Sequence, residues 1–218
     1  MNLTLHYPLM GVLGGTFNPI HHGHLRMAQE VAEQLHFDQV KFIPSANPPH
    51  KPAPEVSAIQ RAEMIKLAIA DNPLFNLDTR EIERNDVSYT VETLKSLYAD
   101  HSDTALCLIL GSDAFLKFDT WHLWQEIIQY CHIILVQRPQ GTSQQGLNKT
   151  LETFMREHYT EDTHKLTQMR AGLITMQAIT ALEISSSQIR HLVQQRQSAI
   201  YLSPLPVIIY MIQHQLYL

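Results

Sequence analysis

The sequence predicts an α/β fold, in which a doubly wound parallel sheet is followed by a small helical C-terminal subdomain. The first observation is a strand, a helix and a strand within 36 residues: an apolar run at 9–13, an amphipathic stretch at 25–35 and an apolar run at 40–44. Such a crossover implies parallel strands and a right-handed connection. The second is the wholly apolar run 105–110, which is typical of a central strand. The third is the helical spacing of the last apolar residues, at 189–212.

These patterns divide the chain into a domain at 1–180 and a helical subdomain at 181–218. Further strands are expected at 75–78, 131–136 and 173–176, and further helices at 57–70, 90–98 and 151–159. In the helix at 57–70, Ile59 is counted among the core contacts. The polar stretch 140–149 is interpreted as a surface loop, and residues 214–218 as an ordinary helix end.

Length and composition indicate a globular protein. The chain has 218 residues, of which 44% are hydrophobic and 17% charged, enough for one full core with at most a small appendage. Its net charge of −5 gives no basic surface for nonspecific nucleic-acid binding. No apolar run approaches the roughly 20 residues of a membrane span, and the N-terminus lacks a signal-peptide pattern, so we expect a cytoplasmic protein. Cys107 and Cys131 lie in separate apolar runs and are predicted to be buried thiols.

The loop after the first strand is the main candidate for chemistry. Gly14 and Gly15 let a ligand approach the backbone, and a helix begins near His22. His21 and His24 stand three positions apart, which puts two side chains on one helix face. Free N–H groups and the helix dipole favour an anion there, and two imidazoles add donors for a phosphoryl oxygen. The loop therefore predicts a phosphate site.

Other interpretations of the two histidines stay open on this pattern alone. They could be zinc ligands, although no third ligand stands at the usual spacing nearby. They could also be an ordinary helix start. A dinucleotide-binding loop is disfavoured because the Gly-x-Gly-x-x-Gly spacing is missing.

A proline-rich segment follows the second strand and lies at the edge of the sheet where ligands bind. It runs from Ser45 to Pro52, and its prolines oppose both strand and helix. Because ligands of open α/β sheets bind at the carboxyl ends of the strands, Lys51 could bring a cation over a bound phosphate. The alternative is a surface loop without a binding role.

Two more positions have a structural and a functional interpretation. Asp113 follows the central strand and could accept from a ribose hydroxyl, help to hold hydrated magnesium, or only cap the next helix. Ser88 is predicted to be the N-cap of the helix at 90–98.

A last polar cluster stands at the start of the C-terminal subdomain. Ser185 with Gln188 has the capping-box pattern, which predicts a helix start. Ser186, Ser187 and Arg190 would then surround a second anion site. A capped helix without a ligand is the alternative.

The segment Gly-Gly-Thr-Phe-Asn-Pro-Ile-His-His-Gly-His at 14–24 resembles the His-x-Gly-His signature of nucleotidyltransferases, and in this longer form it resembles bacterial nicotinate-nucleotide adenylyltransferases. The short motif alone also occurs in cytidylyltransferases, phosphopantetheine adenylyltransferases and class I aminoacyl-tRNA synthetases. Later segments resemble the same family in order: Pro48-Pro49-His50-Lys51, Ser88-Tyr89-Thr90, Gly111-Ser112-Asp113 with Trp121, Arg138-Pro139 and Ile184 to Arg190. One departure is Gln140, which stands where the family often has glycine.

The resemblance implies a Rossmann-like nucleotidyltransferase fold and adenylyl transfer from ATP to nicotinate mononucleotide. The products would be nicotinate adenine dinucleotide and pyrophosphate, a step of NAD biosynthesis. The mononucleotide phosphate would attack the α-phosphorus in line, so catalysis is positioning and charge stabilisation. Mg²⁺ would accompany ATP, with small molecules as partners and neither nucleic acid nor membrane. The oligomeric state is left open.

The resemblance also implies roles for single residues. The catalytic candidates are His21, His24, Lys51 and Arg190. ATP binding falls to Gly14, Gly15, Thr16, Phe17, His21, His24, Gly111, Asp113, Arg138, Ile184, Ser186, Ser187 and Arg190. Mononucleotide binding falls to Thr16, Ser45, Lys51, Thr90 and Trp121. Trp121 would stack on the pyridine ring, although aromatic residues at such positions commonly belong to the core. No residue is assigned to a resident metal ion.

Two other functions are kept beside this one. Phosphopantetheine or cytidylyl transfer would share the first motif but not the later segments together. A nucleotide-sensing module would bind its ligand without turnover.

Overall fold

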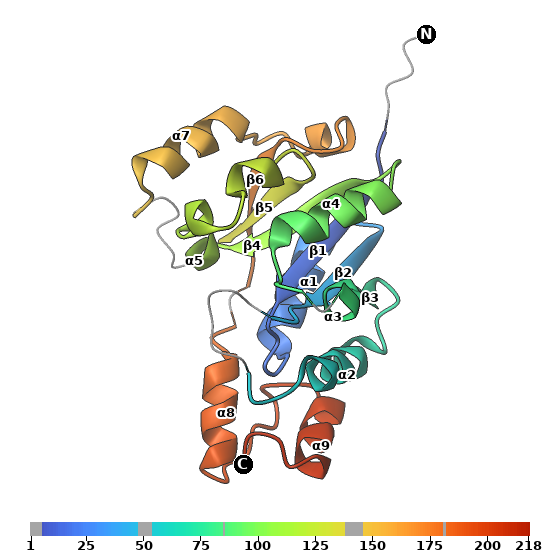
Figure 1. The fold of residues 1–218 in the computed structure, drawn as a ribbon, viewed down its shortest axis with the longest axis vertical. Coiled ribbons are helices and arrows are strands. Elements are labelled where there is room, and N and C mark those ends of the chain that lie inside the picture. Colours follow the sequence, from blue (N-terminus) through green and yellow to red (C-terminus); the bar gives the residue numbers. More distant parts are fainter. Residues whose placement is uncertain (1–5, 48–53, 85, 138–145, 181) are drawn as a thin grey trace.

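The computed structural model describes residues 6–47, 54–84, 86–137, 146–180 and 182–218. Within them, six parallel strands form one sheet in the order β3-β2-β1-β4-β5-β6 (Figure 1). This is the order of a doubly wound α/β sheet, so the predicted fold class is confirmed. The strands are β1 (Leu9–Gly15), β2 (Gln39–Pro44), β3 (Phe75–Leu77), β4 (Ala105–Gly111), β5 (His132–Gln137) and β6 (Ile174–Ala178).

Helices connect and cover the strands. They are α1 (His22–Leu35), α2 (Ala58–Ile69), α3 (Arg80–Arg84), α4 (Thr90–Asp100), α5 (Ser112–Phe115), α6 (Trp124–Ile127), α7 (Lys149–His158), α8 (Ser186–Gln194) and α9 (Leu205–Gln213), with the 3-10 turns η1 (Phe118–Thr120) and η2 (Thr163–Thr167). Across the part of the chain that the structure describes, none of them has the length and hydropathy needed to cross a bilayer.

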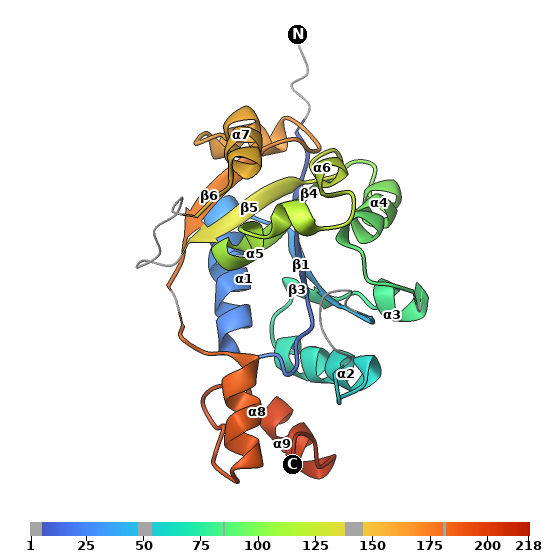
Figure 2. The same cartoon turned by 60° about the vertical axis from the view of Figure 1, so that its left-hand side comes forward.

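Along β1, β4 and β5 the side chains alternate between two apolar cores, one on each face of the sheet. In β1, Leu9 and Leu13 pack with residues of α1, α2 and α9, whereas Met10 and Val12 pack with residues of α4 and α7. Figure 2 shows α1 and α4 on opposite sides of the sheet. Burial on both faces explains why the strands are continuous apolar runs in the sequence.

The last two helices lie beyond the carboxyl end of β1, away from the rest of the sheet (Figures 1 and 2). α9 packs on α2. The segment leading to α8 is fastened to α1, because the Thr180 amide donates to a carboxylate oxygen of Glu30 at 2.6 Å and the Gln34 side chain donates to the Ala178 carbonyl at 2.9 Å. The C-terminal region therefore stands at the edge of the sheet where ligands bind in this fold.

The buried face of α2 contains Ala62, Met64, Ile65 and Ile69, as predicted, but one predicted residue is missing from it. Ile59 is 67% exposed, so its prediction as a core residue is wrong. The buried face carries Arg61, Met64 and Ile65, three or four positions apart. Ile59 lies two positions before Arg61 and therefore points to the opposite side of the helix.

The two cysteines are buried thiols, as predicted. Cys107 lies in β4 and Cys131 directly precedes β5. Burial raises the pKa of both thiols, so both stay protonated and behave as small apolar side chains.

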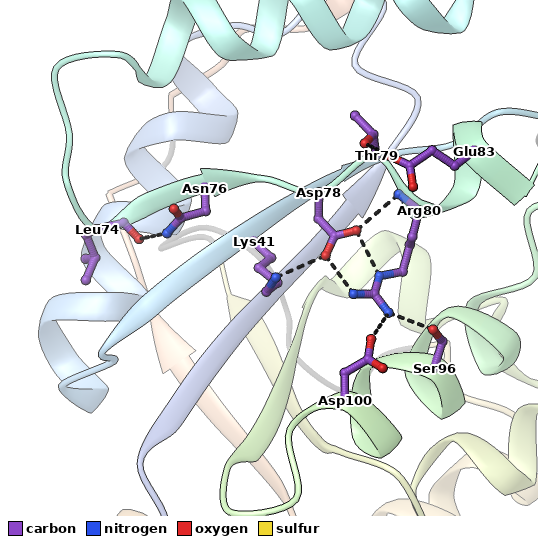
Figure 3. A network of polar contacts seen from close by, with 9 residues as sticks. All are labelled: Lys41, Leu74, Asn76, Asp78, Thr79, Arg80, Glu83, Ser96 and Asp100. Carbon is purple, nitrogen blue, oxygen red and sulfur yellow. Dashed lines mark hydrogen bonds and ion pairs between the residues drawn. The ribbon is translucent and has the colours of Figure 1, made fainter.

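A polar network fastens the β3 edge of the sheet to α3 and α4 (Figure 3). The Asp78 carboxylate accepts hydrogen bonds from Lys41 at 3.1 Å and from Arg80 at 2.8 and 2.9 Å. Arg80 in turn donates to Ser96 at 2.7 Å and to Asp100 at 3.1 Å, both in α4. Burial alone would raise the pKa of Asp78, but the hydrogen bonds from Arg80 and Lys41 outweigh it and hold the pKa below its ordinary value.

Candidate active site

The loop between β1 and α1 brings the two motif histidines together. The ring centroids of His21 and His24 are 3.7 Å apart, with 30° between the ring planes. The His24 ring also packs edge-to-face with the buried Phe17 ring, with 5.0 Å between the ring centroids. The backbone N–H of His21 donates to Nδ1 of His24 at 3.3 Å. Because Nδ1 accepts, a neutral His24 carries its proton on Nε2.

His21 is a buried histidine with an unsatisfied atom. It is 6% exposed, and its Nδ1 has no hydrogen-bond partner among the described residues. Burial, with a smaller contribution from His22, lowers the pKa of His21 to about 4. A buried polar atom left without a partner is costly, and this one faces Gly23 in the first turn of α1.

Position 23 requires glycine because the His21 ring leaves no room for a Cβ atom there. A Cβ at Gly23 would lie 3.0 Å from Nδ1 and 3.1 Å from Cε1 of His21, and 3.5 Å from the Ile184 carbonyl oxygen. Any side chain here would push the His21 ring. The glycine between the two histidines thus lets the imidazole pack against the start of α1.

The C-terminal region holds the backbone of the same loop. Arg190 donates to the Asn18 carbonyl at 2.7 Å, and Ser186 donates to the Pro19 carbonyl at 2.8 Å. Ser203 donates to the Ile20 carbonyl at 2.7 Å, and the His22 amide donates to the Leu202 carbonyl at 3.0 Å. Four contacts, at residues 18, 19, 20 and 22, therefore define the course of the loop into α1.

A pocket of about 580 Å³ opens between this loop and α8. Seven of the residues predicted to bind ATP line it: Gly15, Thr16, Phe17, His24, Ser186, Ser187 and Arg190. The two anion sites predicted separately from the sequence thus form one cavity. Its wall also contains Asn18, Pro54, Glu55, Gln194 and Tyr217, which the sequence did not indicate.

Other predicted ATP-binding residues stand outside this lining. Gly14 is the penultimate residue of β1, His21 lies beneath His24, and the Ile184 carbonyl faces Gly23. Ser185 caps α8 as predicted, because its hydroxyl accepts from the Gln188 amide at 3.1 Å. Lys51 and Arg138 lie outside the described residues.

The N-cap of the helix after β4 is not the predicted residue. Gly111 is the N-cap of α5, and Asp113 is an exposed residue inside its first turn. The alternative that Asp113 caps this helix is therefore wrong, whereas its predicted contacts with ribose or magnesium stay predictions.

Ser88 joins two segments that contain residues predicted to bind the mononucleotide. Its hydroxyl accepts from the amides of Ala46 and Asn47 at 2.9 and 3.2 Å, and its own amide donates to the Asn47 carbonyl at 3.1 Å. The N-cap of α4 is Tyr89, so the prediction that Ser88 caps this helix is wrong. The hydroxyl instead ties the loop after β2, where Ser45 stands, to the segment that leads into Thr90.

The aromatic residues of this region pack around the same segment. Trp121 is half-buried against Phe118, with ring centroids 5.4 Å apart. The ring of Tyr89 lies over that of His122 at 4.2 Å. Trp121 thus keeps part of its surface accessible next to the α4 segment, while Phe118 belongs to the core.

Tyr217 and Arg61 are among the residues of this region that the sequence analysis missed. Tyr217 lies in the segment interpreted as an ordinary helix end, yet it is buried and lines the pocket. Arg61 sits in the first half of an amphipathic helix, where a charged residue is normally exposed, yet it is 1% exposed. Neither position carries a local pattern that predicts its contacts.

Comparison with known proteins shows which family the chain resembles. The family model described as cytidylyltransferase-like matches residues 12–192. A probable nicotinate-nucleotide adenylyltransferase from Psychromonas ingrahamii is 42% identical over 208 residues, covering 95% of this chain and 96% of its own. One from Coxiella burnetii is also 42% identical, over 214 residues, covering 97% of this chain and 99% of its own.

A solved structure shares the fold. It is a Plasmodium falciparum nicotinic acid mononucleotide adenylyltransferase complexed with NaAD, with a TM-score of 0.72 at 15% identity over 97% of this chain and 98% of that chain. At this identity the likeness concerns the fold alone. With relatives at 42% identity over nearly its whole length, the chain belongs to the nicotinate-nucleotide adenylyltransferase family of cytidylyltransferase-like proteins.

Proposed function

We propose that this chain transfers the adenylyl group of ATP to nicotinate mononucleotide, forming nicotinate adenine dinucleotide and releasing pyrophosphate. The proposal rests on one observation: His24, Ser186, Ser187 and Arg190 line the same pocket. Imidazole, hydroxyl and guanidinium donors around one cavity beside a helix N-terminus suit a polyphosphate. The name shared by the relatives supports nicotinate mononucleotide as the acceptor.

The reaction needs no protein nucleophile. A phosphate oxygen of the mononucleotide attacks the α-phosphorus of ATP, the bond from that phosphorus to the bridging oxygen breaks, and pyrophosphate leaves with the electron pair. We assign His21 and His24 to the ATP phosphates, with Nε2–H of His24 nearest the α-phosphoryl oxygen. A donor aimed at developing charge lowers the barrier.

We assign the leaving pyrophosphate to Lys51, Ser186, Ser187 and Arg190. One Nη of Arg190 donates to the Asn18 carbonyl, and the other lies 3.2 Å from the Ser187 hydroxyl. A guanidinium has five N–H donors, so Arg190 can hold the loop and an anion together. This double use explains why the subdomain at 181–218 would complete the ATP site.

Magnesium is assigned to the ATP molecule. The described residues contain no group of three or more His, Cys, Asp or Glu side chains that could hold a metal ion. Mg²⁺ commonly keeps several waters and binds substrate phosphates, so ATP itself supplies suitable ligands.

On the acceptor side, we assign Ser45, Lys51, Thr90 and Trp121 to the mononucleotide. The support is the Ser88 hydroxyl, which joins the loop after β2 to the start of α4. We also assign the activity to the cytoplasm, because two buried free thiols suit a reducing compartment.

The test is pyrophosphate release from ATP and Mg²⁺ with nicotinate mononucleotide, nicotinamide mononucleotide and 4′-phosphopantetheine in parallel. We expect strong release with nicotinate mononucleotide and at most weak release with the other acceptors. Calorimetric titration of ATP on the same preparation shows whether the protein is folded and competent to bind.

Each contrary outcome has a definite meaning. Release only with another acceptor overturns the mononucleotide assignments of Thr90 and Trp121 and keeps those of the phosphate pocket. Binding of ATP without release with any acceptor overturns the enzymatic proposal in favour of a nucleotide-sensing module.

A further inference from the structure

Arg61 is a buried arginine whose guanidinium is divided between two loops. It stands in the first half of α2 and is 1% exposed. Nη1 donates to the Thr16 carbonyl at 2.6 Å, and Nη2 donates to the Ser45 carbonyl at 2.7 Å. Nε points to the Val56 carbonyl at 3.4 Å. The planar fork of arginine spans acceptors of this kind with fixed geometry.

The two loops that Arg61 joins belong to the two sides of the site. Thr16 lines the phosphate pocket, directly after β1. Ser45 directly follows β2, in the loop assigned to the mononucleotide. The two strands are parallel neighbours, and the Ser45 amide donates to the Gly15 carbonyl at 2.9 Å. Arg61 extends that contact by one residue beyond the end of the strands.

A full charge at this buried position loses its hydration, and the need to fill core space does not explain why a charged residue stands there. Burial lowers the pKa of Arg61, and the negative charge of Glu81 opposes this in part, but arginine keeps its proton in proteins. An apolar residue would fill the same core space without the desolvation penalty. The guanidinium donates to the carbonyls of Thr16 and Ser45 through two separate nitrogens.

We propose that Arg61 is a positioning residue for adenylyl transfer. It fixes the loop on the ATP side to the loop on the mononucleotide side, and so sets the distance between the attacking phosphate and the α-phosphorus. The inference rests on the proposed function. It assigns Arg61 no contact with either substrate.

In-line attack needs the reacting atoms about 3 to 3.5 Å apart, and a misplacement of about 1 Å costs roughly a hundredfold in rate. Arg61→Lys keeps the charge but replaces the fork with a single ammonium. We therefore expect kcat per folded molecule to fall by about tenfold to a hundredfold. Because neither substrate loses a direct ligand, the KM for ATP should change much less than kcat.

Arg170 supplies a matched control. Its guanidinium donates to the carbonyls of Tyr98, His101 and Thr104 at 2.9, 2.8 and 3.5 Å and lies 3.6 Å over the Tyr98 ring. These acceptors precede β4 and therefore lie at the opposite edge of the sheet from the pocket. Arg170→Lys is the same chemical change on the same kind of acceptors, and we expect it to lower the melting temperature without lowering kcat.

The experiment compares kcat, both KM values and the folded fraction by circular dichroism for the wild type, Arg61→Lys and Arg170→Lys. A kcat of Arg61→Lys within twofold of the wild type overturns the inference, as does a loss that only follows the unfolded fraction. A wild type that releases no pyrophosphate overturns the proposed function instead.

A second measurement on the wild type covers the case in which Arg61→Lys does not fold. Guanidinium N–H signals are recorded by NMR before and after adding a non-reacting ATP analogue with nicotinate mononucleotide. We expect slower hydrogen exchange at Arg61 and no change at Arg170. Unchanged exchange at Arg61 overturns the inference.

Discussion

The hydroxyl of Tyr217 donates a 2.5 Å hydrogen bond to Oδ1 of Asn18, a residue 199 positions earlier in the chain. The Asn18 carbonyl accepts at the same time from Arg190. Asn18 is therefore held through both its side chain and its backbone by the C-terminal region. Because Asn18 and Tyr217 both line the pocket beside α8, the shape of that pocket depends on a contact between residues 199 positions apart.

Tyr217→Phe removes this hydrogen bond and keeps the ring. We expect the free energy of unfolding to fall by about 1 kcal/mol, which corresponds to roughly 2 to 4 °C in melting temperature for a chain of this size. The KM for ATP should rise severalfold because Asn18 loses one of its two supports. Urea unfolding and initial rates measure both effects. Tyr201→Phe, at a side chain that is 88% exposed, is the control. An unchanged KM for ATP would contradict the prediction.

His24→Ala tests the phosphate site directly. If His24 donates mainly in the transition state, kcat should fall by about a hundredfold to a thousandfold. Steady-state rates with both substrates varied give the answer. The neighbouring His22→Ala removes an imidazole that lies outside the pocket and should keep the wild-type kcat. A loss confined to KM would show that His24 contributes only to substrate binding.

Gly23→Ala should separate stability from activity. Alanine is favoured over glycine in a helix by about 1 kcal/mol, which offsets the crowding. The added Cβ meets His21 at 3.0 Å and displaces its ring. We expect a melting temperature close to that of the wild type and a kcat at least tenfold lower. Glu33→Ala, at an exposed position of α1, controls for the change in helix propensity. A fully active Gly23→Ala would mean that the position of the His21 ring is not critical.

The pKa of His21 also sets a dependence of stability on pH. The unfolded chain binds a proton on this residue near pH 6.5, whereas the folded protein does so only near pH 4. The contribution of a neutral His21 is therefore complete above pH 6.5 and is lost as the pH falls toward 4. Between pH 7.5 and 5 this loss amounts to about 2 kcal/mol.

Urea unfolding of the wild type and of His21→Asn at pH 7.5 and 5 measures how much of the loss in unfolding free energy comes from His21. His132 is buried as well, and burial lowers its pKa, so it contributes a loss of the same sign in both proteins. That loss cancels in the comparison. We expect the wild type to lose more stability than His21→Asn, and an equal loss in the two would exclude His21 as the cause.

The sheet could be predicted from the sequence because its strands are buried on both faces. The run 105–110 is apolar at every position, and it forms one of the two central strands. The start of α1 was also predictable, because glycines, a proline and two histidines mark a strand end and a helix start within a short distance. Ser185 caps its helix through a local hydrogen bond, which is the kind of contact that spacing reveals.

The contacts that shape the pocket could not be predicted in this way. The Thr16 and Ser45 acceptors of Arg61 and the Ala46 donor to Ser88 stand 16 to 45 positions away, and the acceptor of Tyr217 stands 199 away. These contacts join polar groups that are far apart in the sequence, so no periodicity records them. Ile59 was assigned to the core of α2 because the prediction relied on hydrophobicity alone, whereas the side chain that is buried near this position is the charged Arg61.

During synthesis the loop at Asn18 to His22 leaves the ribosome long before its partners at 186, 190, 202, 203 and 217. At the usual speed of bacterial or eukaryotic synthesis, a separation of 199 residues means a wait of about 10 to 40 seconds. During that time β1 can pair with β2 and β4, but the loop has none of its C-terminal partners. A nascent chain can therefore pair the central strands of its sheet well before it can complete this pocket.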